Sequence, residues 1–147
     1  MTDPMEGPPM SHSAADESSV VTKHSARSVG DTVSLLTELI KAKGMRLFAT
    51  IDQSAEARRV GLELRETVLV IFGDPGMGTA VMADAPLAAL DLPLKTLIWA
   101  DGDRTGITYT VPAEIARRYG LTPDLTAKLA GIEALTDALS SAVASGR

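Results

Sequence analysis

The sequence has no cysteine among its 147 residues. This absence excludes disulfide bonds, thiolate metal sites and cysteine nucleophiles together, and it is typical of a reducing cytoplasm. Histidine is also scarce, with only His12 and His24 in the chain. Two isolated histidines without cysteine are a poor ligand set for zinc. We therefore expect no metal site.

The chain also lacks a basic excess and a long apolar run. Its 14 basic and 19 acidic residues give a net charge of −5, whereas nucleic-acid binders usually show a basic stripe. The longest apolar runs, such as 68–72, have the length of a strand and fall far short of a membrane span. Residues 1–19 contain no apolar stretch of the kind a secretory signal needs. We expect a cytoplasmic protein that contacts neither nucleic acid nor membrane.

Hydrophobic residues, in contrast, make up 45% of the chain. A domain of this length can bury roughly 70% of its unfolded surface, which is enough for one core. Residues 1–19 are rich in Pro, Ser and acidic side chains, which predicts a disordered tail. We expect the folded domain over 20–121, and a C-terminal helical extension with a frayed end over 122–147.

Local signals place the secondary structure. Ser28 is a suitable N-cap for a helix that ends at Gly44, and the apolar run in 66–72 predicts an inner strand. Residues 101–106 form the loop of a predicted hairpin. Strands are expected over 20–24, 45–51, 66–72, 94–100 and 107–111, and helices over 29–43, 55–60, 79–85, 86–90, 113–119 and from 122 onward. Because hairpins favour antiparallel pairing, we predict an α+β fold, a two-layer sandwich of a mainly antiparallel sheet with helices on one face.

Several short motifs stand together in a distinctive order. They are Ile51-Asp52-Gln53-Ser54, Gly61-Leu62-Glu63-Leu64, Phe72-Gly73-Asp74-Pro75, Ala85-Pro86, Asp91-Leu92-Pro93-Leu94-Lys95, Ile98-Trp99 and Tyr109. In these motifs, from about Val20 to Leu121, the chain resembles the domain of unknown function 302 (DUF302) family. The resemblance implies a two-layer α/β fold and a homodimer, and it implies no settled activity. The family often has histidine where this chain has Gln53, so a metal, haem or acid/base role for that histidine would be lost here.

The glycine-rich turn 72–78 invites comparison with phosphate-binding loops. Thr79 follows Gly78, so the lysine of a Walker loop is missing, and Val81 stands where a dinucleotide fingerprint needs glycine. The turn is either a tight connection, in which Pro75 stiffens the chain and glycines permit unusual angles, or a nest of backbone N–H groups for a small anion. The candidate ligand-binding residues are Gly73, Asp74, Gly76, Gly78, Thr79 and Trp99.

Two carboxylates follow predicted strands, where functional side chains often gather. Asp52 and Asp74 are either an acid/base pair or, respectively, a helix N-cap and a turn residue.

Lys95 shares one strand face with Trp99. It is either a rim lysine whose ammonium reaches water or a buried nucleophile or base. Trp99 and Tyr109 are expected to lie across the hairpin from each other, packed in the core, in a dimer interface or against a ligand.

The sequence leaves three functional hypotheses open. The first is a homodimeric module that binds a small, anionic ligand in a cleft beside 72–78. The second is an enzyme without a cofactor that uses Asp52, Asp74, Lys95 or Tyr109. The third is a structural or assembly protein that presents an apolar dimer surface.

Overall fold

The computed structural model describes residues 19–141 of the chain. The disordered tail predicted over 1–19, except Ser19, and the frayed C-terminal end lie outside these residues. No helix in the described part is long and apolar enough to cross a bilayer.

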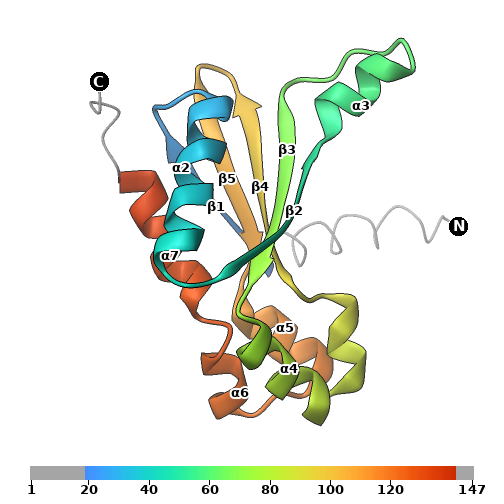
Figure 1. The fold of residues 1–147 in the computed structure, drawn as a ribbon, viewed down its shortest axis with the longest axis vertical. Coiled ribbons are helices and arrows are strands. Elements are labelled where there is room, and N and C mark those ends of the chain that lie inside the picture. Colours follow the sequence, from blue (N-terminus) through green and yellow to red (C-terminus); the bar gives the residue numbers. More distant parts are fainter. Residues whose placement is uncertain (1–18, 142–147) are drawn as a thin grey trace, which may run out of the picture.

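A single five-stranded sheet forms the centre of the fold (Figure 1). Its strands, in spatial order, are β1 (Val20–Ser25), β5 (Arg104–Thr110), β4 (Leu94–Asp101), β3 (Thr67–Gly73) and β2 (Arg46–Asp52). Every neighbouring pair is antiparallel. The predicted antiparallel α+β fold is therefore confirmed, with β1 at an edge and β3 inside the sheet.

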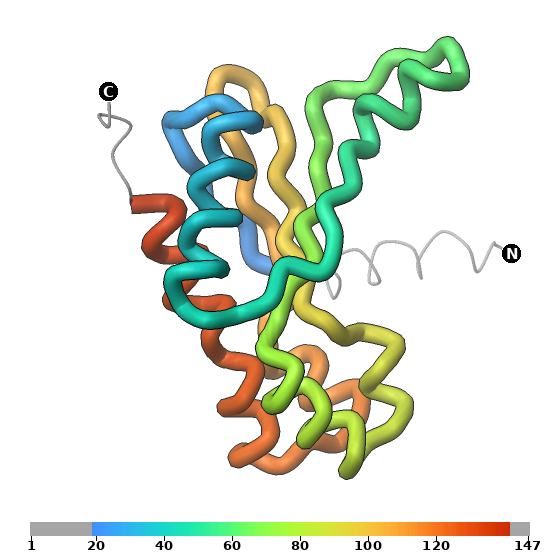
Figure 2. Tube along the Cα trace, viewed as in Figure 1, coloured from blue at the N-terminus to red at the C-terminus, as the bar shows by residue number. Residues whose placement is uncertain are grey.

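The helices occupy three places around this sheet. They are α2 (Val29–Ala42), α3 (Gln53–Arg59), α4 (Pro75–Asp84), the 3-10 helix η1 (Pro86–Leu90), α5 (Pro112–Tyr119), α6 (Pro123–Ala127) and α7 (Gly131–Ser141). Helices α2 and α7 lie side by side against one face, whereas α4, η1, α5 and α6 gather beyond one end of the sheet (Figures 1 and 2). Helix α3 lies in an arm that projects from the other end.

The core fills the layer between the sheet and helices α2 and α7. Strand β3 alternates along its length, with Val70 and Phe72 fully buried and Leu69 and Ile71 half-buried. This alternation arises because successive side chains of a strand point to opposite faces. The inward face therefore supplies the core, and burial of each such side chain contributes roughly 1.5–3 kcal/mol.

Helix α7 is part of this core. Ile132, Leu135 and Leu139 are almost completely buried against the sheet and α2. Lys23 on β1 also anchors the helix, because its Nζ donates to Thr136 Oγ1 at 2.7 Å and pairs with Asp137 Oδ1 at 2.7 Å. The structure thus differs from the expected domain end at residue 121, since the final segment completes the core.

The predicted single helix from residue 122 is divided in two. After α6 the chain tightens, with Leu129 N–H donating to Thr126 O and Ala130 N–H donating to Ala127 O. These i−3 contacts turn the chain before α7 begins at Gly131. The turn lets α7 run along the sheet while α6 stays with the helices beyond its end.

Among residues 19–141 no helix covers the other face of the sheet, which is called here the open face. Its apolar side chains include the half-buried Leu69, Ile71, Leu97 and Trp99, and Ile51 on the edge strand β2, which is 36% exposed. Trp99 pairs with Gly106 in the register of the sheet and donates from Nε1 to Thr108 Oγ1 at 2.9 Å. Lys95 shares this face, as predicted.

The position predicted for Tyr109 relative to Trp99 is wrong. Strand β5 alternates so that Thr108 lies on the open face and Tyr109, 3% exposed, lies in the core. The two aromatic side chains are therefore on opposite faces of the sheet.

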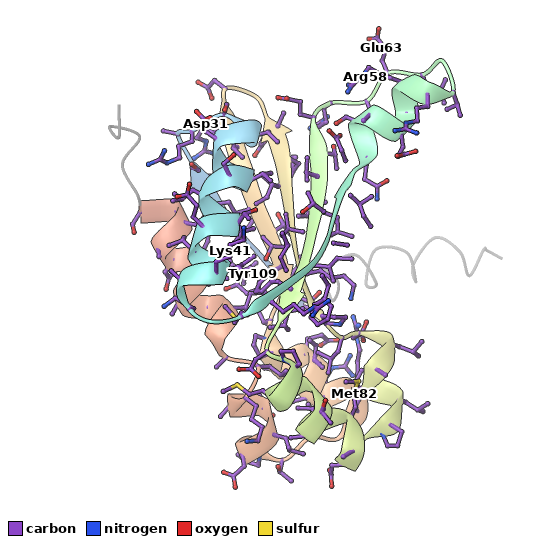
Figure 3. The ribbon with its side chains drawn as sticks, viewed as in Figure 1. Asp31, Lys41, Arg58, Glu63, Met82 and Tyr109 are labelled. Atoms are coloured by element: carbon purple, nitrogen blue, oxygen red, sulfur yellow. The ribbon has the colours of Figure 1, made fainter. Side chains whose placement is uncertain are left out.

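The arm between β2 and β3 is mainly exposed. It holds α3 and the segment 60–66, where Val60 and Leu62 expose 71% and 63% of their surface. Arg58 and Glu63 lie near its far end, well away from Met82 among the helices beyond the other end of the sheet (Figure 3). The apolar side chains of Val60 and Leu62 are therefore exposed and do not pack against the rest of the domain.

Candidate functional site

The segment 72–78 is the end of a strand followed directly by a helix. Strand β3 ends at Gly73, Asp74 is the N-cap, and α4 begins at Pro75 rather than at the predicted residue 79. The glycines with a left-handed backbone in the described chain are others, namely Gly44, Gly61, Gly102 and Gly120. Gly73, Gly76 and Gly78 are not among them, so the expectation that the glycines of the turn 72–78 permit unusual angles is wrong.

The Asp74 carboxylate occupies the N-terminus of α4. Its Oδ1 accepts hydrogen bonds from Gly76 N–H at 2.9 Å and from Met77 N–H at 3.2 Å. A Cβ at position 76 would lie 3.3 Å from the same oxygen, so glycine leaves room for this cap. The N–H groups of the nest hypothesis are already satisfied, and an anion would have to displace Asp74.

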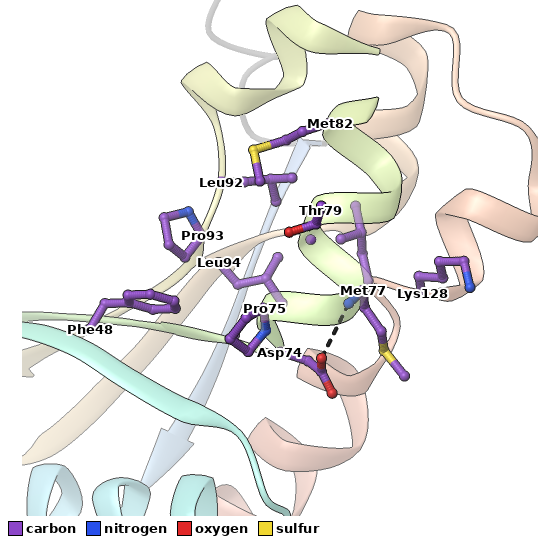
Figure 4. Close-up of a pocket in the computed structure, with 13 residues that line it drawn as sticks. Phe48, Asp74, Pro75, Met77, Thr79, Met82, Leu92, Pro93, Leu94 and Lys128 are labelled. Carbon is purple, nitrogen blue, oxygen red and sulfur yellow. Dashed lines mark hydrogen bonds between the residues drawn. The ribbon is translucent and has the colours of Figure 1, made fainter. Parts of the chain in front are cut away.

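A cavity of about 320 Å³ adjoins this helix start (Figure 4). Four of the six ligand-binding candidates, Gly73, Asp74, Gly78 and Thr79, line it, whereas Gly76 and Trp99 do not. The other lining residues are Phe48, Pro75, Met77, Met82, Leu92, Pro93, Leu94, Lys128 and Leu129.

The walls of this cavity are mainly apolar. Phe48 comes from the irregular part of β2, Met82 from α4 and Leu92 from the segment before β4, and Lys128 lies at the rim after α6. Phe48 and Lys128 lie on opposite sides of the group in Figure 4. No local sequence signal marks Phe48, Leu92 or Lys128, because only the tertiary fold brings these segments together. The cavity fits a small apolar molecule better than a phosphate group.

The two aspartates lie in different parts of the molecule. Asp52 caps α3 at the base of the arm, where its Oδ1 accepts from Ser54 Oγ at 2.6 Å and from Ala55 N–H at 2.9 Å. These two hydrogen bonds hold the pKa of Asp52 below its usual range. Because Asp74 caps α4 beyond the other end of the sheet, the structure does not bring the two carboxylates together.

Lys95 and Tyr109 are also separate from each other. Lys95 lines a second cavity beside Asp91, and Tyr109 lies in the core, where its hydroxyl donates to the Glu133 carboxylate. Burial, with the hydrogen bond to Glu133, raises the pKa of Tyr109. Within residues 19–141 no group of three or more His, Asp or Glu side chains could hold a metal ion. The four acid/base candidates therefore share no cleft in the described structure.

The family model described as domain of unknown function DUF302 matches residues 21–142. The chain belongs to the DUF302 family. The match extends through α7, which agrees with the place of that helix in the core.

A solved structure and two curated relatives are similar to this DUF302 chain. The crystal structure of an uncharacterized conserved DUF302 protein from Bacillus stearothermophilus has a TM-score of 0.71 and 20% identity, over 83% of this chain and 95% of that one. "Fluoride-specific ion channel FluC 1" from Brucella suis and from Brucella abortus are each 38% identical over 124 residues, which is 82% of this chain. The chain spans 48% and 45% of those two relatives, so more than half of each lies outside the match.

Glu114, Arg117 and Arg118 form a charged cluster on α5 of the DUF302 domain. This cluster should make the stability of the domain depend on pH in the acid range. The hydrogen bonds from Arg117 and then Arg118 lower the pKa of Glu114 from 4.5 to about 2. Because the folded pKa is depressed, the contribution of Glu114 to stability is fully present above pH 4.5 and is lost as the pH falls through 2. Denaturant unfolding of wild type and Glu114→Gln should therefore show a stability difference at pH 6 that shrinks toward pH 2. A difference that stays constant across this range would contradict the role of the carboxylate.

Proposed function

We propose that this protein is a homodimeric module that holds a small, mainly apolar ligand with one anionic group in the cavity beside α4. The observation that carries this proposal is the cavity of about 320 Å³, which has the size of a small-molecule site. Its apolar walls would hold the body of the ligand. The ammonium of Lys128 at the rim would attract the anionic end, since Asp74 already fills the helix N-terminus.

Octanoate is a suitable probe, because it joins an apolar chain to a single carboxylate. We expect saturable shifts of the amide resonances of Gly78 and Thr79, and a rise in melting temperature, because a ligand that binds only the native state stabilises it by mass action. Met82→Trp, which fills the cavity, should weaken octanoate binding about tenfold or more, equivalent to about 1.4 kcal/mol.

Leu87→Trp is the matched control for that variant. Leu87 is 71% exposed and does not line the cavity. The control should bind octanoate as wild type does. The ligand proposal fails if octanoate produces no saturable shift, or if Met82→Trp binds it unchanged.

The open face supports the dimeric part of the proposal. Five strands spaced at about 4.8 Å, each about 20 Å long, give a face of roughly 500 Å² in plane. With the exposed arm residues Val60 and Leu62, this surface approaches the roughly 800 Å² per partner of a standard interface. A second copy suits the surface, because one apolar face can meet the same face across a two-fold axis.

Placing a charge on the open face should dissociate this dimer. Leu97→Lys would bury an unpaired ammonium in the interface, so we expect a monomer in sedimentation velocity at concentrations where wild type is a dimer. Trp99, the single tryptophan, should emit at longer wavelength in the variant. Leu87→Lys, outside the face, should stay dimeric. A wild-type protein that is monomeric at all concentrations would contradict the proposal.

The names of the curated relatives do not support a role in fluoride transport for this chain. That activity is named for whole proteins, and the similarity covers less than half of each. The proposed ligand site instead rests on residues that the structure describes.

A further inference from the structure

A second, smaller cavity of about 200 Å³ lies beside the first residues of β4. It is separate from the cavity proposed above, although Leu94 lies in the wall of both. Its lining residues are Leu90, Asp91, Leu94, Lys95, Thr110, Ile115 and Ile132. It places two opposite charges, on Asp91 and Lys95, and the hydroxyl of Thr110 among aliphatic side chains.

The two charges in this cavity do not pair with each other. Lys95 Nζ donates to the carbonyl oxygen of Pro93 at 3.2 Å and makes no ion pair within residues 19–141. Asp91 instead uses Oδ2 to accept hydrogen bonds from Arg118 Nη1 at 2.9 Å and from Tyr119 Oη at 2.6 Å. Both side chains line the cavity, so a molecule inside it could contact Lys95 and Asp91 together.

Three polar groups in the cavity keep unused hydrogen-bonding capacity. Asp91 Oδ1 has no donor in the described structure, and Thr110 Oγ1 has no partner there. The Lys95 ammonium has three N–H donors, of which one contact is to a carbonyl. The cavity thus offers a cation, a hydroxyl and one carboxylate oxygen to a ligand.

The charges restrict the class of ligand. Partial burial would raise the pKa of Asp91, but the hydrogen bonds from Tyr119 and Arg118 outweigh it and lower the pKa. Asp91 is therefore ionised at neutral pH. A simple anion would meet this carboxylate, and a simple cation would meet Lys95. A molecule that carries both charges would complement both groups.

We propose that this smaller cavity binds a small α-amino acid as its zwitterion. The carboxylate of the ligand would lie against Lys95 and Thr110, and its ammonium would donate to Asp91 Oδ1. The volume of about 200 Å³ is roughly seven times the share of a water molecule in the liquid, which is enough for an amino acid of the size of alanine. Its side chain would pack against Ile115 and Ile132, which are almost completely buried.

Calorimetric titration of the full chain with three probes tests this site. The probes are L-alanine, propionate, which lacks the ammonium, and ethylamine, which lacks the carboxylate. We expect alanine to bind about tenfold or more tightly than either of the others, because each lost charge-assisted hydrogen bond is worth a factor of this order. Propionate within threefold of alanine, or no saturable alanine binding, would overturn the proposal.

Two variants test whether alanine binds in this cavity. Lys95→Met keeps most of the side-chain volume and removes the charge, and Thr110→Val removes the hydroxyl. Both should weaken alanine binding while the melting temperature shows that they fold. Lys128→Met, which removes the lysine of the first cavity, should leave alanine binding unchanged. Wild-type affinity in Lys95→Met, or a loss in Lys128→Met equal to that in Lys95→Met, would overturn the assignment.

Discussion

A chain that ends at residue 121 is expected to lose its cooperative unfolding transition. The truncation removes Leu129, Ile132, Leu135 and Leu139, each no more than 2% exposed. Their burial contributes together about 6–12 kcal/mol, which is comparable with the whole stability of a typical domain, about 5–15 kcal/mol. It also uncovers the side of the core against which α7 packs, so no folded state should remain.

Circular dichroism during thermal and urea unfolding measures this effect. A chain that ends at Ser141 is the control and should unfold like the full chain. In the full chain Leu135→Ala should cost about 2–5 kcal/mol, as large-to-small substitutions in a tight core do. A cooperative transition in the chain that ends at residue 121 would show that α7 is dispensable.

The second large effect is expected from Gly106→Ala. A Cβ at this position would lie 2.5 Å from Nε1 and from Cε2 of Trp99, far inside van der Waals contact. The indole would have to tilt away and give up its hydrogen bond to Thr108. We expect a loss of about 1–3 kcal/mol in the free energy of unfolding, with a shift of tryptophan fluorescence to longer wavelength.

The control for this substitution is Gly30→Ala. Gly30 lies within α2, and a Cβ there would meet nothing within 4 Å. Alanine should therefore stabilise the protein by about 0.4–1 kcal/mol. Adding Trp99→Leu should remove most of the cost of Gly106→Ala, since the clash disappears with the indole. A Gly106→Ala protein as stable as wild type would show that the indole moves freely.

The elements that the sequence predicted well are those with local chemical signals. Ser28 Oγ accepts from Asp31 N–H at 3.0 Å and starts α2, and Gly44, with φ of 73°, follows its end. Asp52 likewise caps α3. Such signals act within a few residues along the chain, so the sequence alone reveals them.

The prediction for Tyr109 failed because a short turn determines which residues of the two strands that it joins lie opposite each other. The predicted hairpin loop covered residues 101–106, but Asp101 pairs with Arg104 across a turn of two residues, Gly102 and Asp103. This turn makes Gly106 the partner of Trp99, and Tyr109, three residues further along β5, points to the other face of the sheet because successive side chains of a strand alternate. Tyr109 is therefore in the core and not beside Trp99.

The candidate site could be predicted only in part. Gly73 and Asp74 were found because the strand and helix start are contiguous in sequence. Phe48 and Lys128 are 80 positions apart, and only the tertiary fold brings both into the lining of one cavity. Asp91 became a candidate only when the fold placed it beside Lys95.

Leu94 forms part of the wall of both cavities and is 8% exposed. In so tightly packed a place, a ligand that displaces this side chain on one side changes the shape available on the other. Occupation of either cavity would then alter the affinity of its neighbour, and thermodynamic linkage requires the same factor in both directions. The two sites would thus be coupled through one leucine, so that the binding of each ligand would depend on the concentration of the other.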